Sequence, residues 1–157
     1  MNDENGYRYN VAIVVLNNDN KVLIAKIVNK NKWQFPQGGI DKNEEVVDAM
    51  YRELEEEIGL GKDDVSIITK TTDWLYYDIP IKYRNQKSKV IGQKQIWFLL
   101  KLNASDNKIN LTKHSEIEFD DWAWIDYWES AEKVIDFKKD VYKKALTIFQ
   151  PWVFDNE

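Results

Sequence analysis

Apolar residues along this chain follow a strand-like pattern over much of its length. Two runs rich in β-branched residues, 7–16 (YRYNVAIVVL) and 21–28 (KVLIAKIV), are separated by Asn-Asn-Asp-Asn. Asn and Asp tolerate the backbone angles of a tight turn, so the two runs predict a β-hairpin. A short strand over WQFP leads into Gly38 and Gly39, where we expect a turn or loop. Further strands are predicted near 65–72, 74–79, 90–102 and 119–125.

Two segments have helical periodicity. The first runs from about Asn43 to Ile58, with Gly59 as a left-handed cap. The second runs from about Phe137 to Phe149 and is ended by Pro151. The apolar stripe of the first helix is formed by Val46, Val47, Met50, Leu54 and Ile58. Strands interspersed with helices predict a mixed α/β protein in which helices pack against a sheet.

The composition is typical of a globular protein. The chain has 157 residues, of which 43% are apolar and 31% charged, so we expect a single domain over 1–157. There is no cysteine, which excludes disulfides, thiolate metal sites and a cysteine nucleophile. The N-terminal ten residues resemble no signal peptide, and the longest apolar runs, 11–16 and 96–100, are too short to span a bilayer. We therefore expect a cytoplasmic protein without a membrane partner.

The net charge of −5 limits the way in which this protein can bind nucleic acid. Proteins that coat nucleic acid by neutralising phosphates are usually basic. If this protein acts on RNA or on polyphosphates, it must bind them locally, and we expect a cation to take part.

Carboxylates gather on one face of the first predicted helix. Glu53, Glu56 and Glu57 are neighbours there because positions i, i+3 and i+4 lie together on a helix. Their repulsion is roughly 3 kcal/mol per pair at a dielectric of about 20. One interpretation is a solvated acidic face, but no lysine relieves the cluster anywhere in 43–61. Clustered carboxylate oxygens are typical ligands of Mg²⁺ or Mn²⁺, which explains the accumulated charge.

The same segment resembles the Nudix box. Gly38, Glu44 and the run Arg52-Glu-Leu-Glu-Glu-Glu-Ile-Gly-Leu60 match G-x5-E-x7-R-E-U-x-E-E-x-G-U, where U is apolar, at every specified position. The stretches GYRYNVAIV, WQFPQGGI, IGQKQIWFLL, EFDDWAWIDYW and FKKDVYKKAL extend the resemblance to the bacterial RNA 5′-pyrophosphohydrolases, a branch also described as dinucleoside polyphosphate hydrolases. The resemblance implies a Nudix fold, an α/β/α sandwich around a mixed sheet, with the box at 38–60 forming a loop–helix–loop.

The resemblance also implies roles for the residues of the box. The cations, Mg²⁺ or Mn²⁺ and more than one ion per site, would be held by the residues Gly38 (through its carbonyl), Glu53, Glu56, Glu57 and Glu118. Arg52 and Glu44 would form a structural salt bridge that braces the box. Bound cations offset the charge that develops on the anhydride oxygens and make water a better nucleophile. The general base is Glu53, Glu57 or Glu118, and the sequence does not select among them.

Substrate contacts follow from the resemblance at three places. Arg8 matches a phosphate-binding arginine of the family. The alternative interpretation is that Arg8 is an ordinary surface residue. Phe137 matches an aromatic residue that stacks on an RNA base, and Lys138 and Lys139 would guide the RNA backbone. The alternative is that Phe137 is a core residue at the start of a helix and that the lysines are its solvated side.

Other polar residues are weaker candidates for the substrate pocket. Gln93 and Gln95 lie on one face of a predicted strand and either line the pocket or face water. Tyr77 and Trp33 are further candidates. In the family, the position of Ile27 often carries a basic residue that contacts a phosphate. Lys26 is the candidate that would make this phosphate contact instead. The single histidine, His114, is interpreted as a loop residue.

Three functions are compatible with these observations. The first is an RNA pyrophosphohydrolase, which removes pyrophosphate from the 5′-triphosphate end of RNA, leaves a 5′-monophosphate and so initiates mRNA decay. The second is a hydrolase of free dinucleoside polyphosphates of the Ap4A or Ap5A type. The third is a Nudix-fold binding module without catalysis, which is disfavoured because such modules typically lose carboxylates of the box and none is missing here.

Overall fold

The computed structural model describes residues 1–154, so the last three residues of the expected domain, 155–157, lie outside the described part of the chain. The strands are β1 (Tyr7–Leu16), β2 (Val22–Ile27), β3 (Trp33–Gln34), β4 (Gln37–Gly39), β5 (Val65–Lys70), β6 (Leu75–Asp78), β7 (Gly92–Leu102) and β8 (Phe119–Ile125). The α-helices are α1 (Val46–Ile58), α2 (Ser130–Lys133) and α3 (Lys139–Val153). Short 3-10 turns lie at Lys62–Asp64, Ile81–Tyr83, Asp106–Lys108 and Asp136–Lys138.

The strands form one mixed sheet around a parallel central pair. β1 runs parallel to β7 from Tyr7, beside Gly92, to Leu16, beside Lys101. β2 pairs antiparallel with β1, β3 and β8, β4 pairs antiparallel with β1, and β5 and β6 pair antiparallel with β7. The predicted hairpin exists, but β1 and β2 pair only at Leu16 and Val22. β1 instead pairs mainly with β7 and β4.

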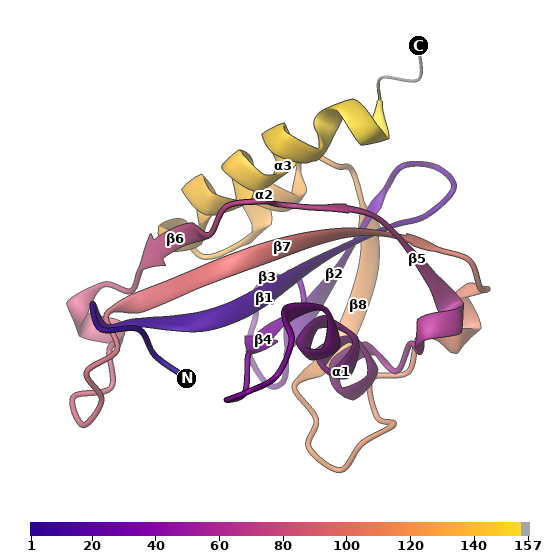
Figure 1. Cartoon of the computed structure of the whole chain (residues 1–157). Helices are drawn as coiled ribbons and strands as arrows, with labels where there is room; N and C mark the ends of the chain where they lie inside the picture. Colours follow the sequence, from indigo (N-terminus) through magenta and orange to yellow (C-terminus); the bar gives the residue numbers. More distant parts are fainter. Residues whose placement is uncertain (155–157) are drawn as a thin grey trace.

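Helices cover both faces of this sheet (Figure 1). Successive side chains of β1 point to opposite faces. Val11 belongs to the core under α1, together with Leu54 of that helix. Val14 belongs to the core on the other face, together with Phe149 of α3. A central strand buried on both faces needs a continuous apolar run, which is why 11–16 contains no polar residue. The predicted α/β/α sandwich around a mixed sheet is confirmed.

The helix α1 ends as predicted but begins later. Gly59 has a φ of +82° and its N–H donates to the carbonyls of Leu54 and Glu55, which makes it the left-handed cap. The helix begins at Val46 because Asn43 has a φ of +66°, which is outside the helical region. Of the predicted apolar stripe, Met50, Leu54 and Ile58 are buried, Val46 is partly buried and Val47 is exposed.

The predicted turn at Gly38 and Gly39 is wrong, because both residues lie in β4 and pair with β1 at Val11 and Asn10. Neither glycine has a positive φ. Both glycines lie close to charged side chains: a Cβ on Gly38 would displace the Glu53 carboxyl group, and one on Gly39 would lie 2.9 Å from the Arg8 guanidinium.

The C-terminal helix also differs from its prediction. Phe137 lies in a 3-10 turn, and α3 begins at Lys139 and continues through Pro151 to Val153. The last turn persists because Val153 is buried in the core and Phe154 packs edge-on against Tyr127. No helix within residues 1–154 has both the length and the hydropathy of a bilayer span.

A buried hydrogen bond fastens α3 to the sheet. The backbone N–H of Phe35 donates to the hydroxyl of Tyr142 at 3.0 Å, and the two rings stack with their centroids 4.8 Å apart. Both residues are buried, so no water can replace the hydroxyl. This contact holds the segment between β3 and β4, which leads into the site described below.

We expect Tyr142→Phe to lower the free energy of unfolding by about 1–3 kcal/mol, because it leaves the Phe35 N–H buried without an acceptor. Chemical denaturation measures this change. Tyr83→Phe is the matched control, since Tyr83 is 50% exposed, and it should leave stability unchanged. Equal effects of the two substitutions would show that the Tyr142 hydroxyl contributes nothing specific.

Candidate active site

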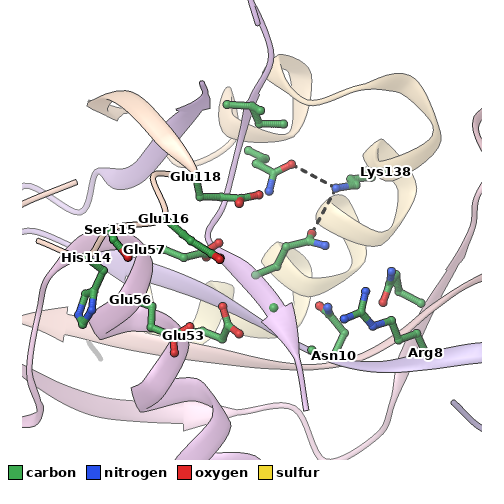
Figure 2. A pocket seen from close by; sticks show the side chains of 16 residues that line it. Arg8, Asn10, Glu53, Glu56, Glu57, His114, Ser115, Glu116, Glu118 and Lys138 are labelled. Atoms are coloured by element: carbon green, nitrogen blue, oxygen red, sulfur yellow. Dashed lines mark hydrogen bonds between the residues drawn. The ribbon is translucent and has the colours of Figure 1, made fainter. Parts of the chain in front are cut away.

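A cavity of about 720 Å³ opens where β1, β3, β4, α1 and the segment before β8 converge. Its lining residues are Arg8, Asn10, Ile27, Gln34, Gln37, Gly38, Gly39, Glu53, Glu56, Glu57, Gln93, His114, Ser115, Glu116, Glu118 and Lys138. Figure 2 shows the carboxylates on one side of this cavity and Arg8 and Lys138 on the other. The cavity therefore has an acidic wall and a basic wall.

The acidic wall combines one helix with one loop. Glu53, Glu56 and Glu57 come from the last turns of α1, and Glu118 comes from the residue before β8. Glu57 is buried, and its Oε1 atom has no hydrogen-bond partner among the described residues. Burial, with Glu53 and Glu118 adding to it, raises the pKa of Glu57 to about 9. Burial also raises the pKa of Glu53, against the opposing effect of Arg52.

A buried carboxylate without a partner is costly unless a cation compensates its charge. The uncompensated Oε1 atom of Glu57 and the surrounding hard oxygens fit a divalent cation. Within residues 1–154, no three acidic or histidine side chains converge closely enough to enclose an ion as they stand. Glu53 is turned toward Arg52 instead, with 2.7 Å between Oε1 and Nη1.

Arg52 makes the salt bridge to Glu44 that was predicted. Its Nε and Nη2 atoms each lie 2.9 Å from a carboxylate oxygen of Glu44. The same guanidinium also donates to the Gly39 carbonyl at 2.8 Å and to Glu53 at 2.7 Å. The contact with Glu53 was not expected from the sequence. These contacts, with that to Glu44 the strongest, raise the pKa of Arg52 well above its ordinary value.

The basic wall contains a largely buried lysine. The Lys138 ammonium donates to the side-chain oxygens of Gln34, at 3.2 Å, and Gln37, at 3.3 Å. Burial lowers the pKa of Lys138 to about 8. Gln37 in turn donates to the Tyr77 hydroxyl at 3.2 Å. A lysine held in this way is oriented toward the cavity, and an anion bound there would stabilise its charge.

Comparison with known proteins assigns the chain to a family. Residues 6–145 match the NUDIX domain. The chain belongs to the Nudix family. It is 51% identical to a protein of Ruthia magnifica subsp. Calyptogena magnifica named RNA pyrophosphohydrolase, over 100% of this chain and 89% of that protein. It is 49% identical to a protein of the same name from Francisella tularensis subsp. mediasiatica, over 98% of this chain and 99% of that protein.

Solved Nudix-like structures show the same fold. The Ap4A hydrolase of C. elegans, in a binary complex, superposes with a TM-score of 0.65 at 18% identity, over 90% of this chain and 98% of that one. The dihydroneopterin triphosphate pyrophosphohydrolase of E. coli also gives a TM-score of 0.65, at 17% identity and the same two coverages. At these identities the likeness concerns the fold alone.

The structure brings together only some of the predicted substrate residues. Arg8, Gln93 and Lys138 line the same cavity as the predicted metal ligands Glu53, Glu56, Glu57 and Glu118. Phe137 lines a smaller neighbouring cavity of about 180 Å³, together with Trp33.

Four other candidates lie outside the main cavity. Gln95 is completely buried and bonds to Asn10 and Trp97, because β7 enters the core two residues after Gln93. Lys26 pairs with Asp120, and Lys139 pairs with Asp136 at 3.2 Å. Tyr77 contacts the site indirectly: its hydroxyl accepts from Gln37, and its ring centroid lies 5.5 Å from the Lys138 ammonium.

Sequence reasoning missed several residues of the cavity wall. Ser115, Glu116 and His114 belong to the segment that carries Glu118, so their closeness to Glu118 in the chain was the available signal. Gln34 and Gln37 flank Phe35 and Pro36, and no pattern in the sequence distinguishes them from solvated residues.

We expect Gly38→Ala to keep the fold but to reduce hydrolysis of a phosphoanhydride substrate by about 100-fold. The added Cβ displaces the end of the Glu53 side chain, and a misplacement of about 1 Å is enough for a loss of that size. Gly61→Ala is the matched control, because a Cβ there lies 3.7 Å from its nearest neighbour, Asp64. Equal activities of the two variants would contradict the proposed closeness of Gly38 and Glu53.

We expect Glu57→Gln to change the pH dependence of stability in metal-free buffer. The raised pKa of about 9 means that Glu57 keeps its proton in the folded state above pH 4.5, where the unfolded state has lost it. The free energy of unfolding of the unmodified protein should therefore fall by about 1.4 kcal/mol per pH unit from pH 5 to 8, relative to the variant. Denaturation at several pH values measures this difference, and parallel profiles would show that Glu57 is not desolvated.

Proposed function

We propose that this protein is an RNA pyrophosphohydrolase, a metal-dependent Nudix hydrolase that converts the 5′-triphosphate end of RNA to a 5′-monophosphate with release of pyrophosphate. This reaction initiates mRNA decay, and we place it in the cytoplasm. The observation that carries the proposal is a cavity with opposed acidic and basic walls that lies beside a smaller cavity lined by aromatic residues. Relatives named RNA pyrophosphohydrolase that align over nearly the whole chain support it.

The acidic wall is the proposed metal site. Its ligands would be the carboxylates of Glu53, Glu56, Glu57 and Glu118 and the carbonyl of Gly38. We propose Mg²⁺ or Mn²⁺, with more than one ion, because hard oxygen ligands select these cations. Bound cations supply Lewis acidity toward the phosphoanhydride and lower the pKa of water. The candidates for the general base are Glu53, Glu57 and Glu118.

The basic wall is the proposed phosphate contact. Arg8 and Lys138 face the carboxylates across the cavity (Figure 2), so a polyphosphate chain between the two walls would meet cations on both sides. A bound phosphate favours the protonated form of Lys138 and so opposes the effect of its burial. These two residues would orient the triphosphate and offset the charge that develops on its oxygens.

The smaller cavity favours RNA over a free nucleotide. It shares the lining residues Ile27, Gln34 and Lys138 with the main cavity, so the two cavities are adjacent. The Phe137 ring is partly buried there and lies 5.7 Å from the Tyr83 ring, between centroids. A base that follows the triphosphate-bearing nucleotide can stack on such an aromatic surface, with Lys139 near its backbone. Hydrolysis of free dinucleoside polyphosphates is the alternative, and it uses the same metal site.

We expect the enzyme to act faster on triphosphorylated RNA than on diadenosine tetraphosphate. Phe137→Ala should slow the reaction with RNA by about tenfold, the effect of losing one stacked base. A nucleoside 5′-triphosphate, which lacks the following nucleotides, should be affected far less. Initial rates on the three substrates measure this. Trp152→Ala is the control, because Trp152 is an exposed aromatic residue of α3 that lines neither cavity. Faster turnover of the dinucleotide by the unmodified enzyme would favour the alternative function, and equal losses on all substrates with a lower melting temperature would make Phe137 a core residue.

A further inference from the structure

Glu55 belongs to the same acidic stretch of α1 as Glu53, Glu56 and Glu57, but unlike them it does not line the cavity. It lies between Glu53 and Glu56 in α1, yet its carboxylate is turned to the segment before β8. Its Oε2 atom lies 2.7 Å from the Lys113 ammonium, and its Oε1 atom lies 2.9 Å from Nε2 of His114. The Lys113 ammonium also reaches the carbonyl of Gly59, the cap of α1, at 3.5 Å.

The segment that Glu55 contacts is otherwise attached only at its ends. At one end, the N–H of Asn110 donates to the carbonyl of Ile58 at 2.7 Å. At the other end, the carbonyl of Glu118 accepts from the N–H of Val28 at 3.0 Å. Among the described residues, Thr112 donates only to the side chain of nearby Asn110. The hydrogen bonds that join 111–117 to more distant parts of the protein are those of Lys113 and His114 to α1 and its cap. These contacts therefore attach the loop in its middle, directly before Ser115, Glu116 and Glu118, which line the cavity.

We propose that Glu55 is a positioning residue that clamps the loop 111–118 onto α1 through Lys113 and His114, and so fixes Glu118 opposite Glu53, Glu56 and Glu57. This inference rests on the proposed metal site. Glu118 follows His114 by four residues, and Ser115 and Glu116 between them line the cavity. A loop released from α1 would let the Glu118 carboxylate sample positions away from the other three. Glu55 touches neither the cavity nor the substrate, so its effect is indirect.

The clamp should affect the site more than the stability of the fold. The side chains of Glu55, Lys113 and His114 are 38%, 44% and 41% exposed. Ion pairs with this exposure contribute little to the free energy of unfolding. Their loss is a local event, because the core under α1 does not include them.

For one of two substitutions, the effect of charge on cation binding is opposite in sign to the effect of the clamp. Glu55→Gln removes a negative charge beside the metal ligands and would weaken cation binding with or without a clamp. Lys113→Met removes a positive charge from the same surroundings, so the field of the protein should then favour a cation. If Lys113 acts through the clamp, its loss weakens cation binding instead. Lys113→Met therefore separates the two effects.

The test measures binding of Mn²⁺ without substrate by electron paramagnetic resonance, together with amide hydrogen exchange. We expect Lys113→Met and Glu55→Gln each to raise the dissociation constant of Mn²⁺ by about tenfold, the lower end for residues that orient metal ligands. Exchange should become faster in 111–117 while the melting temperature stays the same. The double variant should lose no more affinity than Glu55→Gln alone, because both substitutions break one contact.

Lys108→Met is the matched control, since Lys108 is an exposed lysine of the same connection between β7 and β8. It should leave the exchange of 111–117 unchanged and should not weaken Mn²⁺ binding. Unchanged or tighter binding of Mn²⁺ by Lys113→Met would overturn the clamp. Failure of the unmodified protein to bind Mn²⁺ would overturn the proposed metal site, and with it this inference.

Discussion

The hydrogen bonds of Arg52 are the interaction on which the geometry of the site depends. One guanidinium joins the loop before α1, through Glu44, to the backbone of β4, through the Gly39 carbonyl, and to the proposed ligand Glu53. Because the guanidinium is planar and its donors have a fixed geometry, it determines the distance between helix and strand as well as the orientation of Glu53. Gly38 completes this constraint, since only a residue without a side chain leaves room for the Glu53 carboxyl group. The same guanidinium thus both stabilises the box and orients Glu53, a proposed metal ligand.

The charge that Arg52 leaves uncompensated marks the place where a cation belongs. Its contacts reach Glu53 and, at 3.5 Å, Glu56, but no hydrogen bond reaches Oε1 of the buried Glu57. A protein selected for stability alone would not bury a carboxylate in this way, because desolvation without a partner costs free energy. Local violations of this kind are expected at functional sites. The proposed cation and the basic wall would also let a protein with a net charge of −5 bind a polyphosphate, since both would act locally.

Much of the fold could be predicted because local sequence determines it. The bounds of β1 and β8 follow from runs of apolar residues, and Gly59 ends α1 by its own backbone conformation. The predicted elements are wrong where tertiary contacts determine the local structure. Gly38 is a strand residue because it pairs with Val11 of β1, and α3 continues past Pro151 because Val153 is buried. Neither contact leaves a pattern within a short window of sequence.

The candidate site likewise contains residues that could be predicted from local sequence and residues that could not. The glutamates at helical spacing could be predicted to share a face, because the periodicity of α1 places them there. The different environment of Glu55 could not, since it depends on a loop more than fifty residues away that brings Lys113 to the helix. Gln93 and Gln95 are indistinguishable in sequence, and only the depth of β7 in the core separates a cavity residue from a buried one.

The junction between the two cavities connects the chemistry with recognition of the substrate. Phe137 and Lys138 are neighbours in one 3-10 turn, whose tight geometry points their side chains in different directions. The aromatic ring lines the smaller cavity, and the ammonium reaches Gln34 and Gln37 beside the proposed metal site. A substrate that extends from its phosphates to a further base would contact both residues at once, so correct placement of the base would also place the triphosphate. A nucleoside triphosphate has no further base and would use only the second contact, so under the proposed function this turn would favour the end of an RNA chain over a mononucleotide.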